Sequence, residues 1–173
     1  SIRAISDLKG KSILIGMSGS GMAASALKML HFHGLDEVNT NLKNAYFTGL
    51  DGNQNMDAAI VTAGILNSDL VELLESGNYR IIPIEYAQAF CEKNAFFSPT
   101  VIHKGLYRMG DSLLSHDIPT VATTALLVGR EELSHEVVDQ ILLASFEKAS
   151  YVQSPVMLNI EEVRQQQDLK LHP

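Results

Sequence analysis

The sequence lacks several features that would point to particular classes of protein. Its single cysteine, Cys91, cannot form an internal disulfide, and its cysteine and histidines do not have the spacing of a metal site. The 13 Lys and Arg residues are outnumbered by 20 Asp and Glu residues, the net charge is −7, and there is no basic run. Such a chain is poorly suited to bind nucleic acids or anionic membranes. The longest apolar runs are too short to cross a bilayer, which takes about 20 residues.

The apolar content is high enough for a folded core. Hydrophobic residues make up 46% of the 173 positions, which excludes wholesale disorder. The length fits one domain or two small lobes. Because the chain begins at Ser1 without an initiator methionine or a leader pattern, we expect it to be an excised part of a longer protein, shortened at its N-terminus.

Short apolar segments alternate with amphipathic ones along the first half of the chain. The patterns predict strands over residues 13–15, 39–46, 58–62 and 80–84, and helices over residues 22–30, 69–74 and 86–93. Asn67 or Ser68 is expected to cap the second of these helices. Alternation of buried-type strands with helices predicts an α/β fold, with a largely parallel sheet flanked by helices.

The second half follows a different pattern. It predicts strands over residues 100–103 and 120–128, a long helix capped by Ser134, and a final helix that begins at Ser154. The composition changes around residues 104–119, which we interpret as a crossing between two lobes.

The strongest local motif is the glycine-rich turn at residues 16–21, with the sequence GMSGSG. It lies between a predicted strand and a predicted helix, so its backbone N–H groups can bind an anion at the helix N-terminus. Ser18 and Ser20 add hydroxyl groups, and the glycines allow close approach to the backbone. The same pattern also forms a tight turn with a serine N-cap and no ligand.

Three nucleotide or phosphate readings of this turn fit less well. Met22 and Ala23 stand where a Walker A motif has its lysine and hydroxyl residue. A dinucleotide fingerprint lacks its acidic residue, because Asn41 and Asn44 occupy that region. The turn also resembles the first phosphate loop of SIS sugar-phosphate domains, but the expected second serine cluster is replaced by VTAGILN at residues 61–67. An SIS-like or nucleotide-binding domain is therefore the alternative hypothesis.

A longer series of motifs resembles TAXI-type solute receptors, the binding proteins of one branch of TRAP transporters. The motifs, in chain order, are DLKGK at 7–11, GSG at 19–21, MDAAIVTAG at 56–64, YRIIPI at 79–84, IHKGLY at 102–107, DIPTV at 117–121, ALLV at 125–128, the helix at 136–146 and LHP at 171–173. Their order and spacing cover almost the whole chain.

This resemblance implies a type II periplasmic binding-protein fold with a ligand site between two lobes. It implies that residues 1–116 form an α/β ligand-binding lobe, and that residues 117–173 supply the return strand and C-terminal helices of the other lobe. The implied protein is periplasmic or extracytoplasmic and not an enzyme, needs no cofactor or metal, and binds a small organic anion or an amino acid such as glutamate. Its partners would be the membrane permease subunits of a TRAP transporter, unless the domain serves as a sensor.

The resemblance and the turn together give a set of candidate ligand-binding residues. They are Ser18, Gly19, Ser20, Gly21 and Met22 in the first loop, Thr62, Ala63 and Gly64 at the end of a neighbouring strand, and Tyr107. Tyr107 is expected to stack on the ligand or to form a hydrogen bond with it. Asp57 is expected to be structural. No His/Glu pair lies beside either loop in the sequence, which disfavours isomerase chemistry.

Overall fold

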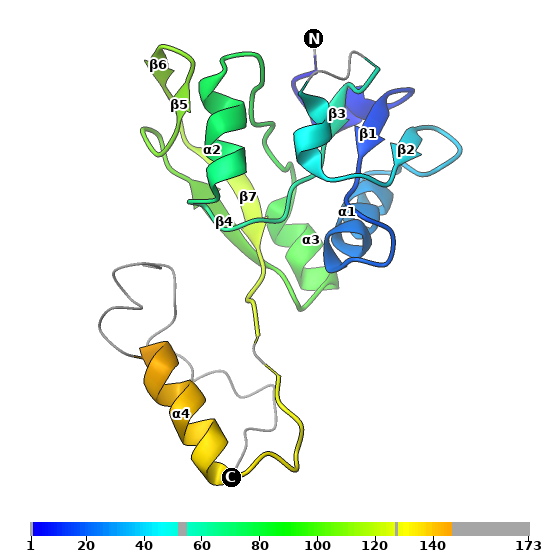
Figure 1. Ribbon diagram of the computed structural model, residues 1–173. Helices are drawn as coiled ribbons and strands as arrows, with labels where there is room; N and C mark the ends of the chain where they lie inside the picture. Colours follow the sequence, from blue (N-terminus) through cyan, green and yellow to red (C-terminus); the bar gives the residue numbers. More distant parts are fainter. Residues whose placement is uncertain (1, 52–54, 127, 147–173) are drawn as a thin grey trace. The chain divides into compact units, whose positions relative to one another are not determined.

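The computed structural model describes residues 2–51, 55–126 and 128–146. The chain divides into two compact units, Ser1–Thr124 and Ala125–Pro173 (Figure 1). The candidate site residues all belong to the first unit.

A three-stranded parallel sheet forms the centre of the first unit, with the strand order β2-β1-β3 (Figure 1). The strands are β1 (Ser12–Leu14), β2 (Asn41–Lys43) and β3 (Ala58–Ala59). Asp57 supports this sheet, as predicted, because its carboxylate accepts a hydrogen bond of 2.9 Å from the Ser12 amide. The first three predicted strands are thus confirmed, the second and third as shorter segments, and so is the mixed α/β fold with a parallel sheet.

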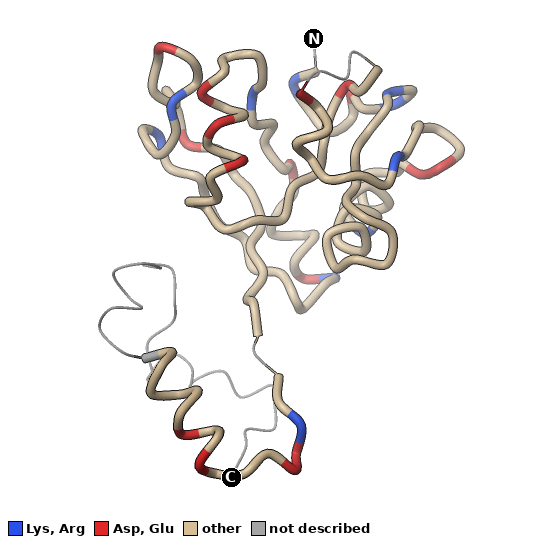
Figure 2. Tube along the Cα trace, viewed as in Figure 1, with Lys and Arg blue, Asp and Glu red and all other residues tan. Residues whose placement is uncertain are grey.

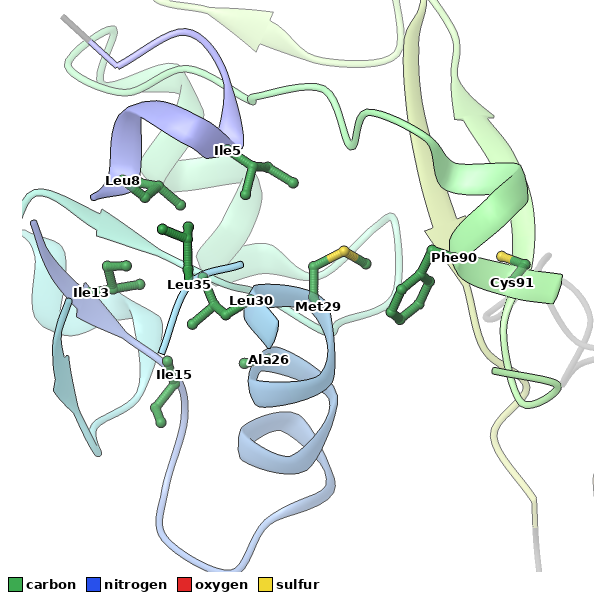
Figure 3. Packing of buried hydrophobic residues seen from close by; sticks show 10 residues of the cluster. All are labelled: Ile5, Leu8, Ile13, Ile15, Ala26, Met29, Leu30, Leu35, Phe90 and Cys91. Atoms are coloured by element: carbon green, nitrogen blue, oxygen red, sulfur yellow. The ribbon is translucent and has the colours of Figure 1, made fainter. Parts of the chain in front are cut away.

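The two faces of β1 are covered by different elements. Ile13 and Ile15 face helix α1 (Gly21–Phe32) and belong to a cluster that Figure 3 shows from close by. Leu14 points to the opposite face, where it packs with residues of the 3₁₀ helix η2 (Phe47–Leu50) and of helix α2 (Ser68–Glu75). A strand that is apolar on both faces is expected when helices cover both sides of a parallel sheet.

Helix α3 (Ala87–Lys93) packs near the C-terminal end of α1. Met29 of α1 extends toward Phe90 of α3 in Figure 3, and the Phe90 ring lies 5.3 Å from that of Phe32. The Nδ1 atom of His33 lies 2.9 Å from the Met29 carbonyl oxygen, and its Nε2 atom lies 3.0 Å from the Glu85 carbonyl oxygen. The predicted helix over residues 86–93 is confirmed.

An antiparallel pair completes the framework of the first unit. It consists of β4 (Ser98–Ile102) and β7 (Ile118–Ala122), close to the strands predicted over residues 100–103 and 120–128. The strand predicted over residues 80–84 is wrong, because this segment has no strand conformation. Its Ile84 amide donates to the Pro119 carbonyl of β7 at 2.9 Å, but one hydrogen bond does not make a ladder.

A small hairpin between β4 and β7 was not predicted. It pairs β5 (Arg108–Met109) with β6 (Ser112–Leu113) around a turn at Gly110, whose φ is 65°. The turn lies against the end of α2: a Cβ atom on Gly110 would stand 3.3 Å from the Gly77 Cα, and the Gly110 amide donates to the Leu74 carbonyl. A glycine followed by aspartate between short strands is a hairpin signal, so the sequence did contain a cue.

The second unit contains helix α4 (His135–Phe146) among its described residues. The Ser134 hydroxyl oxygen accepts a hydrogen bond from the Val137 amide at 3.4 Å, which confirms the predicted cap. The final helix predicted from Ser154 lies outside the described residues. Of the helices that can be described, none is long and apolar enough to cross a membrane.

The boundary between the units lies between Thr124 and Ala125, whereas the sequence placed the lobe boundary after residue 116. β7 pairs with β4 along its whole length and so belongs to the first unit. The assignment of residues 117–173 to the other lobe of the receptor stays a prediction.

We expect Gly110→Ala to destabilise the first unit more than Gly105→Ala does. Both glycines have positive φ, 65° and 83°, so an alanine costs about 1 kcal/mol at either position. A methyl group at Gly105 would meet no atom within 4 Å, whereas at Gly110 it would press on the Gly77 backbone and add about 1–3 kcal/mol. Urea unfolding of the two variants measures the difference, and equal destabilisation would contradict the close contact.

We also expect the stability to depend on the ionisation of Asp117. Its carboxylate accepts a hydrogen bond of 2.8 Å from the Lys104 amide, and this bond, together with nearby His103, holds the pKa of Asp117 below its ordinary value of 3.8. A carboxyl group with a lowered pKa in the folded state stabilises the fold above its ordinary pKa, and the contribution is lost as the pH falls through the lowered pKa.

The test compares wild type with Asp117→Asn in urea unfolding from neutral pH to below that ordinary value. The advantage of the wild type over the variant should shrink on acidification. A difference that stays constant over the whole range would show that the charge of Asp117 does not contribute.

Candidate ligand-binding site

The two predicted loops leave the sheet at the same edge. β1 and β3 are parallel neighbours, and the Ile60 amide still donates to the Leu14 carbonyl at 2.9 Å just beyond the last paired residues. After β1 the chain crosses to β2 on one side, and it returns through η2 to β3 on the other side. The strand order therefore reverses between β1 and β3, which is where open α/β sheets bind ligands.

The glycine turn is held in place from several directions. Gly16 has a φ of 91°, and a Cβ atom there would come within 2.9 Å of the Met22 side chain. The Gly16 amide donates to the Ala45 carbonyl, and the Asn44 side-chain amide donates to the Gly16 carbonyl at 3.1 Å. The loops after β1 and β2 are thus joined, and only glycine fits at residue 16 without displacing its neighbours.

The turn ends at a capped helix N-terminus. The Ser20 hydroxyl oxygen accepts a hydrogen bond from the Ala23 amide at 3.1 Å, which leaves its own O–H free to donate. The amides of Gly21 and Met22 belong to the first turn of α1, where N–H groups have no partner within the helix. Ser18 and Gly19 are exposed beside them. The helix dipole adds a partial positive charge at this end.

Met22 contributes to this place differently from its neighbours. Its side chain lies over Gly16 and packs against the cluster that contains Leu14 and Phe47. What Met22 can offer a ligand is therefore its backbone amide. The long apolar side chain serves the packing of the turn.

The second loop presents Thr62, Ala63 and Gly64, which are exposed. It closes through a hydrogen bond of 3.0 Å from the Asn67 amide to the Gly64 carbonyl. Asn67 then caps α2 by accepting a hydrogen bond from the Leu70 amide at 3.0 Å, as predicted. The loop offers backbone groups and one hydroxyl at the edge that the glycine turn shares.

Tyr107 lies beneath this second loop. Its side chain is 4% exposed, and its hydroxyl donates to the Ile65 carbonyl at 2.7 Å. Burial raises the pKa of Tyr107, so the hydroxyl keeps its proton and remains a donor. The structure thus brings Tyr107 to the predicted loop. Direct contact of Tyr107 with a ligand stays a prediction.

The loops at this edge carry no Asp, Glu, Lys or Arg residue. None occurs in residues 12–27, 44–50 or 58–68, and the chain that leaves β1 and enters α1 is tan throughout the turn in Figure 2. Large apolar side chains are exposed on these same loops: Met17, Tyr46, Ile65 and Leu66. Amides, hydroxyls and apolar side chains can bind a small solute, but they do not provide a general acid and base of suitable pKa.

The sequence did not point to two of the residues that shape this edge. Asn44 joins the first two loops, and Ile65 supplies the carbonyl that Tyr107 holds. Both contacts join positions at least 28 residues apart, which no local pattern reveals.

The described residues contain a hollow away from the predicted site and no cluster of metal-ligating side chains. A hollow of about 560 Å³ lies at the opposite end of α1, lined by Ser6, Phe32, His33, Glu85, Tyr86 and Lys93, and is thus separate from the predicted site. Within residues 2–51, 55–126 and 128–146, no three His, Cys, Asp or Glu side chains are grouped so that they could hold a metal ion.

We expect Ser20→Ala to destabilise the first unit by about 1 kcal/mol, because it removes the N-cap of α1. Ser18→Ala is the matched control in the same loop. Ser18 is exposed, so we expect its loss to change the stability by less than about 0.5 kcal/mol. Thermal or urea unfolding measures both, and a larger effect at Ser18 than at Ser20 would contradict the capping role.

Comparison with known proteins gives a family for the chain. No curated protein matched the sequence. The model of the NMT1-like family matches residues 1–173, the full length of the sequence. This family is periplasmic-binding-protein-like, which suggests solute binding without catalysis and an extracytoplasmic location. The chain therefore belongs to the NMT1-like family.

Proposed function

We propose that this chain is the ligand-binding part of an extracytoplasmic solute receptor that captures a small organic anion or an amino acid such as glutamate. The observation that carries the proposal is the meeting of two uncharged loops at the point where the strand order reverses. One loop ends at the N-terminus of α1, which favours an anionic group such as a carboxylate.

The candidate residues take separate roles in this proposal. The amides of Gly21 and Met22, with the hydroxyls of Ser18 and Ser20, bind the anionic group of the solute. Gly19 keeps the backbone open to its approach. Thr62, Ala63 and Gly64 contact the solute from the neighbouring loop. The exposed apolar side chains at this edge surround its less polar part.

The family favours binding over catalysis, and the chemistry of the loops supports this. An enzyme at this edge would need a proton donor and acceptor, yet the only titratable side chain within residues 44–50 is Tyr46, and residues 12–27 and 58–68 contain none. The alternative function, an SIS-like or nucleotide-binding domain, draws support from the two serines at a helix N-terminus. It lacks a charged partner for a phosphate on these loops.

We propose further that the parent protein delivers its solute to the permease subunits of a TRAP-type transporter, as the TAXI-like motifs suggest. A sensor built on the same domain is the other use of such a receptor. Residues 117–173, which include α4, are proposed to supply the return strand and C-terminal helices of the other lobe, the first lobe of the receptor. Closure of two lobes around a solute is the general mode of such proteins.

A substitution at Ser20 tests the position of the anion. Ser20→Asp keeps an N-cap but places a fixed negative charge where the anionic group of the solute should lie, and Ser20→Asn keeps the cap without the charge. We expect Ser20→Asp to bind L-glutamate or succinate at least about tenfold more weakly than Ser20→Asn, a difference of about 1.4 kcal/mol. Isothermal titration of the two variants measures this ratio.

A thermal-shift screen of the wild type with L-glutamate, succinate, glucose 6-phosphate and NAD precedes the titration. Stabilisation of the wild type by these compounds alone would favour the SIS-like or nucleotide-binding alternative. Equal affinities of Ser20→Asp and Ser20→Asn for a bound carboxylate would reject the helix N-terminus as the anion site.

A further inference from the structure

The hairpin of β5 and β6 contacts both ends of the segment that carries the second loop. At one end the Tyr107 hydroxyl, just before β5, binds the Ile65 carbonyl. At the other end the Gly110 amide donates to the Leu74 carbonyl in the last turn of α2. Figure 1 shows the hairpin beside α2. The hairpin therefore spans the length of the helix that follows the loop.

The attachment at α2 is close. A Cβ atom on Gly77 would stand 3.2 Å from the Gly110 Cα, so the two backbones touch where both residues lack a side chain. The hairpin is closed next to Tyr107 by a hydrogen bond of 2.8 Å from the Leu114 amide to the Tyr107 carbonyl. The Tyr107 backbone is therefore held within the hairpin, while its side chain extends to the loop.

At the loop, the hairpin is attached by a hydrogen bond from a buried group. Tyr107 is 4% exposed, so water has little access to its hydroxyl. The Ile65 carbonyl supplies the hydrogen-bond partner that this buried group needs. By contrast, residues 60–65 form no helix or strand, and Ile65 is itself 40% exposed. A rigid donor meets a segment that has little regular structure of its own.

We propose that Tyr107 is a positioning residue of the solute site: its hydroxyl holds the Ile65 carbonyl and so sets the shape of the loop that presents Thr62, Ala63 and Gly64. The importance of this loop rests on the proposed function, whereas the contact itself does not. Since the hydroxyl already donates to a backbone carbonyl, the role differs from direct contact with the solute.

Tyr107→Phe tests the role, because it removes the hydroxyl and keeps the buried ring. Tyr79→Phe is a matched control in the same unit: the Tyr79 hydroxyl also donates to a distant backbone carbonyl, that of Leu50, at 3.0 Å. Amide hydrogen exchange in the full chain reports each region separately. Asn67 reports the loop, Asp51 reports the end of η2, and Ile15 reports the core.

We expect the Asn67 amide to exchange about fivefold faster in Tyr107→Phe, with Asp51 and Ile15 unchanged, because one hydrogen bond that restrains the loop is lost. Tyr79→Phe should speed exchange at Asp51 and leave Asn67 as in the wild type. Acceleration of all three amides by Tyr107→Phe, or of none, would overturn the positioning role and leave Tyr107 an ordinary core residue.

Binding adds a readout that a purely structural role would not move. In a titration with L-glutamate, Tyr107→Phe should bind about fivefold more weakly than the wild type, and Tyr79→Phe should bind as the wild type does. Faster exchange at Asn67 with unchanged affinity would overturn the proposal. Absence of L-glutamate binding by the wild type would count against the proposed function, and the exchange at Asn67 would still decide whether Tyr107 holds the loop.

Discussion

β1 forms backbone hydrogen bonds with strands on both sides and packs side chains into cores on both faces, and the rest of the first unit depends on this double constraint. Ile13 is fully buried on the α1 side, and Leu14 is 3% exposed on the side of η2 and α2. Parallel neighbours cannot be joined by tight turns, so the chain must cross over the sheet twice. The crossovers lie on opposite faces, and both loops leave at the same edge.

The chemistry at that edge follows from the backbone more than from side chains. A helix N-terminus and a glycine turn present N–H groups, and the surrounding loops add hydroxyls and apolar groups but no fixed charge. Backbone N–H groups and hydroxyls of this kind can donate hydrogen bonds to a small polar or anionic molecule. They are compatible with the solute binding that membership of a periplasmic-binding-protein-like family suggests.

The later part of the first unit contacts the segment that follows β3. β4 and β7 pair antiparallel, and the hairpin between them reaches back to the loop after β3 and to the end of α2. Asp117 secures the base of the hairpin by binding the Lys104 amide. The loop after β3 thus has a hydrogen-bond donor, Tyr107, that lies 42 positions away from Ile65 in the sequence.

The sequence by itself determined the elements whose cause is local. The strand, glycine turn and helix around Gly16 follow from a short apolar run, glycines with positive φ and a serine cap. Asn67 and Ser134 cap their helices because each capping oxygen lies within three residues of the amide that it binds. The strand predicted over residues 80–84 failed because an apolar run does not show whether a neighbouring strand pairs with it along its length.

Only the tertiary structure decided which distant groups meet. The glycine turn and the family resemblance made Met22 and Tyr107 candidate site residues, and the fold packs the Met22 side chain over Gly16 and pairs the Tyr107 hydroxyl with the Ile65 carbonyl. The periodicity of a sequence indicates which side chains face a core or the solvent, but it does not indicate which distant residue each side chain contacts. That partner is set by packing and hydrogen bonding across the whole unit, where a buried hydroxyl takes the acceptor that the folded chain places within reach.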